Sequence, residues 1–173
     1  MPYLERPDGC RLFFELHGDA AALPVVLLEG SGGDLPGWGS SIDDLAGSFR
    51  VLAFDLRGNG SSDMPDVPVT MDDFVEDLFA LMDHVGIDRA HLYGQSFGGM
   101  VAQVAALVAP DRVRSVVLAA THCGGSGTVR ARVKVPKDRP YLALFSASFA
   151  REHPDRVDEH QRLAAKNRQA PHA

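Results

Sequence analysis

Short apolar runs alternate with helical patterns along the first 125 residues. Residues 25–28 and 51–54 are continuous apolar runs, which are typical of strands buried on both faces of a parallel sheet. Residues 116–119 have the same character and predict a further buried strand, and residues 90–93 predict a short one. Residues 3–17 predict two strands around the turn Pro7-Asp8-Gly9, which indicates a hairpin at the sheet edge.

Helical patterns fill the spaces between these strands. Thr70 with Asp73 forms a capping-box start, and Gly86 stops the apolar stripe that follows. A second stripe begins after Ser96 and ends at Pro110, and a shorter helix is expected around Ile42. Strands that alternate with helices at this spacing predict an α/β fold, with a mostly parallel, doubly wound sheet and helices on both faces.

The character of the chain changes after residue 125. A basic stretch comes first, followed by an apolar-faced helix predicted at 141–149 and by a charged segment, 151–173, that reads as an exposed helix or a frayed tail. The basic residues are Arg130, Arg132, Lys134, Lys137 and Arg139. We therefore divide the chain into a core, 1–125, and a second part, 126–173, that begins a lid or cap segment and ends in the polar tail.

Composition narrows the class of protein. The chain has 173 residues, of which 45% are apolar and 23% charged, as in an ordinary globular domain. A net charge of −6 argues against nucleic acid or an anionic membrane as the main partner. Two cysteines, the lack of an N-terminal signal pattern and the lack of a membrane-length apolar run predict a cytoplasmic protein. Gly30-x-Gly32 begins a dinucleotide fingerprint, but Leu35 stands where its third glycine belongs, so no cofactor is expected, and no metal either.

The candidate chemistry centres on residues 94–99, Gly94-Gln95-Ser96-Phe97-Gly98-Gly99. This segment lies between a predicted strand and a predicted helix, which is the setting of a nucleophile elbow. The elbow would hold Ser96 in a strained conformation with its hydroxyl exposed. Gly94 and Gly98 are expected to be glycine because a side chain at either position would crowd the turn.

Two further loops follow predicted strands at the same edge of the sheet: residues 29–33, Glu29-Gly30-Ser31-Gly32-Gly33, and the polar turn 55–63. With these loops and the elbow, the chain resembles the α/β-hydrolase superfamily, in the branch of small esterases, non-haem haloperoxidases and epoxide-hydrolase-like enzymes. The resemblance implies hydrolysis of a small ester-like substrate through an acyl-enzyme on Ser96. It also implies that the backbone N–H groups of Phe97 and Ser31 hold the oxyanion.

The chain departs from the family pattern at two points. Glu29 stands where the family often has histidine, and we expect it to point away or to form a hydrogen bond within its loop. The resemblance also places the catalytic Asp and His after two further strands, beyond residue 173, which implies a C-terminally truncated hydrolase lacking its last strands. Strand 116–119 would then be an apolar sheet edge, and we expect poor solubility or self-association through it.

His122 is the resident histidine best placed to replace the missing base. It follows a parallel strand on the same edge as Ser96, where ligand chemistry gathers, so it is a candidate pocket residue or base. Asp63 is the nearest candidate for an acid partner, although it more simply holds its own turn. Cys123 is expected to be a buried, inert thiol.

The sequence leaves two functions open. One is a serine hydrolase with esterase-like activity through Ser96. The other is a catalytically incomplete remnant of the fold, or a binding module that has kept the elbow without its triad.

Overall fold

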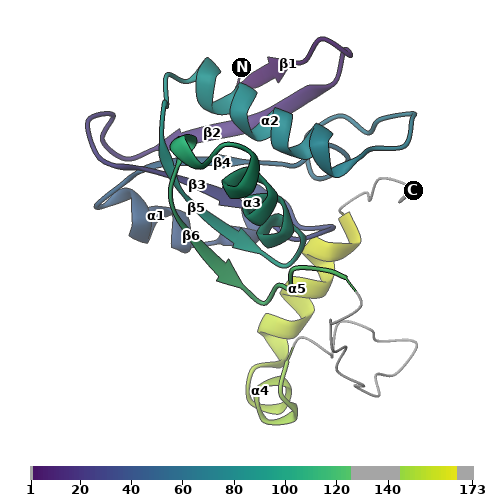
Figure 1. Cartoon of the computed structure of the whole chain (residues 1–173). Helices are drawn as coiled ribbons and strands as arrows, with labels where there is room; N and C mark the ends of the chain where they lie inside the picture. The colour runs from purple at the N-terminus through teal and green to yellow at the C-terminus, as the bar shows by residue number, and fades with distance from the viewer. Residues whose placement is uncertain (1, 126–144, 167–173) are drawn as a thin grey trace.

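One mixed sheet organises the structure, a computed structural model that describes residues 2–125 and 145–166 (Figure 1). Within these residues the sheet has the strand order β1-β2-β4-β3-β5-β6. The strands are β1 (Tyr3–Glu5), β2 (Arg11–His17), β3 (Pro24–Leu28), β4 (Arg50–Phe54), β5 (Ala90–Gln95) and β6 (Val113–Ala119).

The strand directions confirm the fold class that the sequence predicts. β3 runs parallel to β4 and β5, and β6 runs parallel to β5. β1 and β2 form the predicted antiparallel hairpin, and β2 pairs antiparallel with β4. The carboxyl ends of β3, β4, β5 and β6 therefore meet at one edge of the sheet, where the candidate chemistry lies.

Helices cover both faces of the sheet, so it is doubly wound. The short η1 (Leu35–Trp38) and α1 (Ser41–Ala46) lie on one face, whereas α2 (Met71–His84) and α3 (Phe97–Val108) lie on the other. The Thr70–Asp73 capping box that the sequence predicts is present at the start of α2. The remaining helices are η2 (Pro110–Arg112), α4 (Ala147–Glu152) and α5 (Pro154–Lys166).

Alternate residues of the central strands pack into two separate hydrophobic cores, one on each face of the sheet. Val26 and Leu28 pack with α2 and α3, while Val25 and Leu27 pack with η1 and α1. Because side chains alternate between the faces of a strand, a strand covered on both sides needs an apolar residue at every position. This requirement explains the unbroken apolar run of β3.

The predicted burial of strand 116–119 is wrong. β6 is the last strand in the sheet order, and the side chains of Val117 and Leu118 are about half exposed, at 49% and 48%. An apolar run is suited to a buried strand, but the strand is buried only if another strand or helix covers it.

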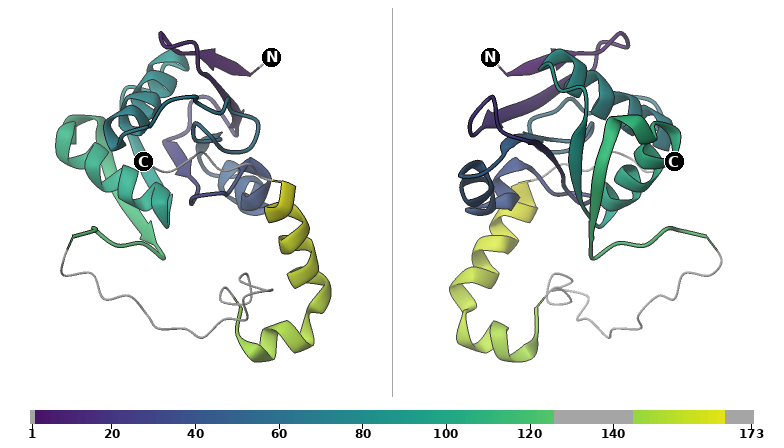
Figure 2. Two further views of the ribbon diagram at one scale, coloured as in Figure 1. Left: turned by 90° about the vertical axis from the view of Figure 1, so that its right-hand side faces the viewer. Right: turned by 60° about the vertical axis from the view of Figure 1, so that its left-hand side comes forward.

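The segment after residue 125 is described only in part. α4 overlaps the end of the helix expected at 141–149, and α5 falls within the charged segment 151–173. The two helices follow one another at an angle and are in contact (Figure 2). The basic stretch 130–139 lies outside the described residues, and the division at residue 125 stays a prediction. No helix among the described residues is both long and apolar enough to cross a membrane.

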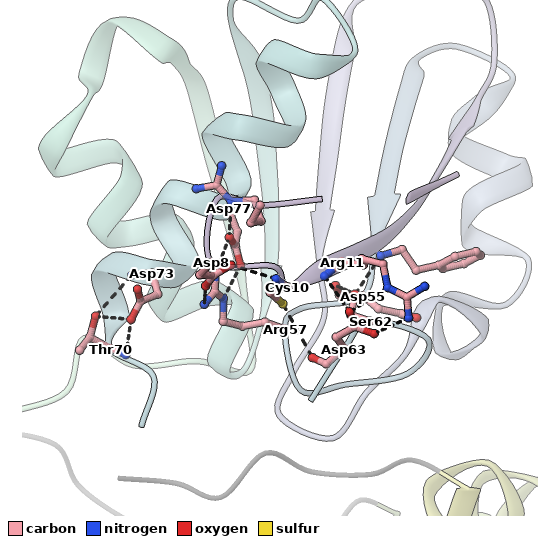
Figure 3. Close-up of polar contacts among 12 residues, drawn as sticks. Asp8, Cys10, Arg11, Asp55, Arg57, Ser62, Asp63, Thr70, Asp73 and Asp77 are labelled. Carbon is pink, nitrogen blue, oxygen red and sulfur yellow. Dashed lines mark hydrogen bonds and ion pairs between the residues drawn. The ribbon is translucent and has the colours of Figure 1, made fainter. Parts of the chain in front are cut away.

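A buried ion-pair network ties the first hairpin and the loop after β4 to α2 (Figure 3). Asp77 of α2 accepts two hydrogen bonds from Arg57, at 2.6 and 2.7 Å, and one from Arg6 at 2.8 Å. Asp8 in the hairpin turn accepts a further bond from Arg57 at 3.0 Å. The hydrogen bonds to Asp77 hold the pKa of Arg57 above its ordinary value, despite the opposing effect of burial.

Replacing Asp77 by alanine should destabilise the fold by about 3–5 kcal/mol, because the Arg57 charge would stay buried without its main partner. The Arg57 side chain is only 6% exposed, so water cannot take the place of the carboxylate. Denaturant unfolding measures the change, with Glu76→Ala on the exposed side of α2 as the matched control. A loss below about 1 kcal/mol, in the range of a surface ion pair, would contradict this role.

A second copy of the chain is the partner we propose for β6, the last strand of the sheet among the described residues, where the exposed Val117 and Leu118 and the strand edge offer a template for strand pairing. Val117→Lys should weaken self-association at least about tenfold, because pairing would then bury a charge. Sedimentation over a concentration series measures it, with Val67→Lys at an exposed loop position as the control. A wild-type chain that stays monomeric throughout, or an equal effect of both variants, would refute the proposal.

Candidate active site

Ser96 occupies a sharp bend between β5 and α3. Its backbone has φ 49° and ψ −114°, a conformation that residues with side chains rarely adopt and that is found at functional turns. The Ser96 N–H donates to the carbonyl of Ala119 at 2.9 Å, and the Thr121 hydroxyl donates to the Ser96 carbonyl at 2.6 Å. The residue is exposed, and its Oγ has no hydrogen-bond partner among the described residues. The bend therefore presents a free hydroxyl at the carboxyl edge of the sheet.

Close backbone contacts explain the glycines on either side of Ser96. A Cβ at Gly98 would lie 2.2 Å from the carbonyl oxygen of Leu28, and one at Gly94 would lie 2.5 Å from the Cα of Gly99. These atoms belong to the backbone and cannot rotate away. The crowding that the sequence predicts at both positions is therefore present.

The loop after β3 lies directly against the elbow. A Cβ at Gly30 would be 3.2 Å from the Cβ of Ser96, so only a glycine backbone fits there comfortably. The Gly33 N–H donates to the Gly30 carbonyl at 3.0 Å, which closes a tight turn over residues 30–33. Gly32, the third residue of the turn, has φ 75°, as a type II turn requires.

Two backbone N–H groups beside Ser96 are candidates to receive a negative charge. Ser31 is the second residue of the loop turn, and its N–H donates to no acceptor within the described residues. Phe97 is the first residue of α3, and the first N–H groups of a helix have no partner inside the helix. These are the two donors that the resemblance implies. Their role at an oxyanion stays a prediction.

The loop after β4 holds the first loop in place through Asp55. The Asp55 carboxylate is buried and accepts the N–H of Leu35 at 2.6 Å and of Ser61 at 2.7 Å. Burial raises the pKa of this carboxyl, while the two N–H donors act in the opposite direction. Asn59 adds a bond from the Gly32 N–H at 3.3 Å. The turn 55–63 is thus a support for the loop that carries Ser31.

Asp63 belongs to the same turn but bonds to Arg11 of β2 rather than to the loop that carries Ser31. Its carboxylate pairs with the Arg11 guanidinium at 2.9 Å and also accepts the Arg11 N–H (Figure 3). The hydrogen bond from the Arg11 side chain lowers the pKa of Asp63. Asp63 therefore holds its own turn, as the simpler interpretation of the sequence has it, and it makes no bond to a histidine in the part of the chain described.

Glu29 forms a hydrogen bond within its loop, as expected. Its Oε1 accepts the Gly30 N–H at 3.0 Å, and the residue is only 7% exposed. Burial raises the pKa of Glu29, and the neighbouring acids Asp34 and Asp55 raise it further.

His122 lies after β6, on the same edge as Ser96, but no hydrogen bond joins the two residues. The His122 Nδ1 accepts the N–H of Gly124 at 2.9 Å, and the residue is exposed. An imidazole whose Nδ1 is an acceptor carries its proton on Nε2 when neutral, so neither nitrogen is free to act as a base in this arrangement. Cys123 is exposed, and the prediction of a buried thiol is wrong.

Two features of the structure have no sequence signal. Thr121, which pins the Ser96 carbonyl, is an ordinary threonine after a strand in the sequence. Ser115 Oγ lies 2.8 Å from His91 Nδ1 on neighbouring strands, at the far end of the sheet from Ser96. Ser115 lies at a register irregularity between β5 and β6, near the start of β6 and away from the elbow, so its replacement leaves Ser96 untouched and makes it a suitable control serine. The described residues contain no cluster of ligands that could hold a metal ion.

Comparison with known proteins gives the site its context. A family model described as the alpha/beta hydrolase fold matches residues 24–139. A putative carbamate hydrolase RutD of Azorhizobium caulinodans is 32% identical over 154 residues, which cover 89% of this chain and 57% of that protein.

Solved structures agree with this match. A hydrolase from Pseudomonas aeruginosa PA01 superposes with a TM-score of 0.78 at 29% identity, over 94% of this chain and 64% of that one. The enol-lactonase from Burkholderia xenovorans LB400 has a TM-score of 0.76 at 27% identity, and the match covers 95% of this chain and 66% of that one. The chain thus spans between 57% and 66% of the length of these three proteins.

Proposed function

Since the chain belongs to the alpha/beta hydrolase fold family, we propose that it carries the nucleophilic half of a serine hydrolase site, with Ser96 as the nucleophile. Ser96 Oγ attacks the carbonyl carbon of a small ester-like substrate and loses its proton to a general base. The tetrahedral intermediate expels its leaving group, which takes up a proton, and an acyl-enzyme remains. Water then attacks the acyl-enzyme, releasing the acid and regenerating Ser96.

One observation carries this proposal: an exposed serine at a positive-φ bend lies against a turn with an unused N–H. The Ser31 and Phe97 N–H groups are the proposed oxyanion donors, and each such donor typically lowers a barrier by about 3 kcal/mol. The N-terminus of α3 adds the positive end of its dipole on the same side.

The names of similar proteins support the substrate class. One is named for a carbamate and another for an enol-lactone. Both compounds contain an acyl carbonyl bonded to a heteroatom leaving group, which is the chemistry that a serine and an oxyanion hole serve. We therefore propose a small ester, lactone or carbamate as the substrate.

A second function stays open: a catalytically incomplete remnant of the fold, or a binding module that uses the same site. A specific observation favours it, because no imidazole is bonded to Ser96 Oγ among the described residues and His122 Nδ1 is already occupied. A serine without an adjacent base is a weak nucleophile. The two functions differ in whether Ser96 is activated.

Reaction with a fluorophosphonate probe measures that activation. If Ser96 is activated, the wild-type chain should be labelled at least about a hundredfold faster than Ser96→Ala, in which only unassisted serines remain, since general-base assistance contributes about 10²–10⁴ in rate. Peptide mapping after labelling should place the adduct on Ser96.

Ser115→Ala is the matched control, because it removes the serine that bonds to His91 and leaves the elbow intact. It should be labelled at the wild-type rate. His122→Ala should be labelled at nearly the wild-type rate as well, whereas a hundredfold loss would make His122 the base. Equal labelling of wild type and Ser96→Ala would refute the hydrolase proposal and favour the remnant.

A further inference from the structure

The Glu29 side chain folds back into the loop that carries Ser31. Its Oε1 accepts the N–H of the next residue, Gly30, at 3.0 Å. A Cβ at Gly33 would lie 2.0 Å from the Glu29 Cγ, so the glutamate stem fills the space that a side chain at Gly33 would need. Glu29 thus contacts both ends of the turn over residues 30–33.

We propose that Glu29 is the positioning residue of this loop, and that its carboxylate fixes the Gly30–Ser31 peptide in the orientation that turns the Ser31 N–H toward Ser96. The reason for a carboxylate beside a site that would hold a negative charge is then structural. The carboxylate accepts the Gly30 N–H at the start of the turn.

The peptide geometry supports this assignment. The Gly30 carbonyl accepts the Gly33 N–H inside the turn, and the N–H of a trans peptide points opposite to its carbonyl. The Ser31 N–H therefore points out of the turn, and the turn lies against Ser96 through Gly30. Glu29 anchors the preceding peptide through the Gly30 N–H, so the chain enters the turn in a single orientation. The catalytic consequence rests on the proposed function, but the anchoring itself does not.

The electrostatic surroundings of Glu29 are acidic. The charged groups that act on it are Asp34 from its own loop and Asp55 from the loop after β4. Burial is the largest cause that raises the pKa of Glu29, and repulsion from the two acids adds to it, while the Gly30 N–H opposes both. A carboxylate accepts an N–H more strongly than a carboxyl group does, so the anchor should weaken as the pH falls through a value above the ordinary range of glutamate.

Amide hydrogen exchange at Gly30, followed by NMR at neutral pH, tests the anchor without any need for turnover. Glu29→Ala should exchange at Gly30 at least about tenfold faster than wild type, because a hydrogen bond to a charged acceptor is lost. Glu29→Gln keeps an oxygen acceptor of the same length and should recover most of the protection. Core amides of β3 and β4 should keep their wild-type rates, which separates local anchoring from general destabilisation.

Asp34→Asn is the matched control, since it removes a neighbouring charge without touching the Gly30 N–H. It should leave exchange at Gly30 unchanged and should lower the midpoint of the Gly30 nitrogen shift on pH titration, because a like charge is gone. Unchanged exchange at Gly30 in Glu29→Ala would overturn the proposal. Equal loss of protection in Glu29→Gln and Glu29→Ala would overturn it too.

The fluorophosphonate assay separates this inference from the proposed function. If wild type is labelled at Ser96, Glu29→Ala should be labelled about tenfold more slowly and Glu29→Gln at nearly the wild-type rate. If wild type is not labelled, the hydrolase proposal fails, while faster Gly30 exchange in Glu29→Ala would still establish the anchor.

Discussion

The close approach of two backbone segments determines the rest of this structure. Gly98 at the start of α3 lies against the carbonyls of Leu28 and Glu29, and Gly30 lies against Ser96. A side chain at Gly98 would separate the elbow from the loop after β3, and one at Gly30 would be crowded against Ser96. The loop that carries the unused Ser31 N–H lies against Ser96 because these contacts leave no room for a further side chain.

Buried carboxylates hold the two loops at this edge of the sheet, and they are satisfied in two different ways. Asp77 neutralises the buried Arg57 and connects the first hairpin to α2. Asp55 and Glu29 instead accept backbone N–H groups of the loops, without an ion-pair partner among the described residues. The first arrangement stabilises the framework, and the second determines where loop amides point. A site that depends on N–H direction needs the second kind.

The sequence predicted the framework well because the framework follows from local patterns. Burial on both faces demands unbroken apolar runs, which identify β3 and β4, and the glycines around Ser96 follow from crowding at a tight bend. The apolar run of β6 by itself predicts burial, because an apolar run looks the same whether or not a neighbour covers it; its place at the sheet edge was expected only from the resemblance. The orientation of His122, the exposure of Cys123 and the bond from Thr121 to the elbow depend on a few dihedral angles after β6, where Ala120 adopts φ 48°. No pattern of residue types encodes those angles.

The central claim is that the Ser31 and Phe97 N–H groups both donate to the oxyanion of a substrate that is covalently attached to Ser96 Oγ. The most direct measurement is the NMR shift of these two amide protons before and after Ser96 is modified with a phosphonyl group, whose polarised phosphoryl oxygen stands in for the oxyanion. Both protons should move strongly downfield, as strong hydrogen bonds form to that oxygen, while the Gly30 amide should change little. If neither the Ser31 nor the Phe97 proton moves in the modified protein, the site is not an oxyanion hole and the account is contradicted.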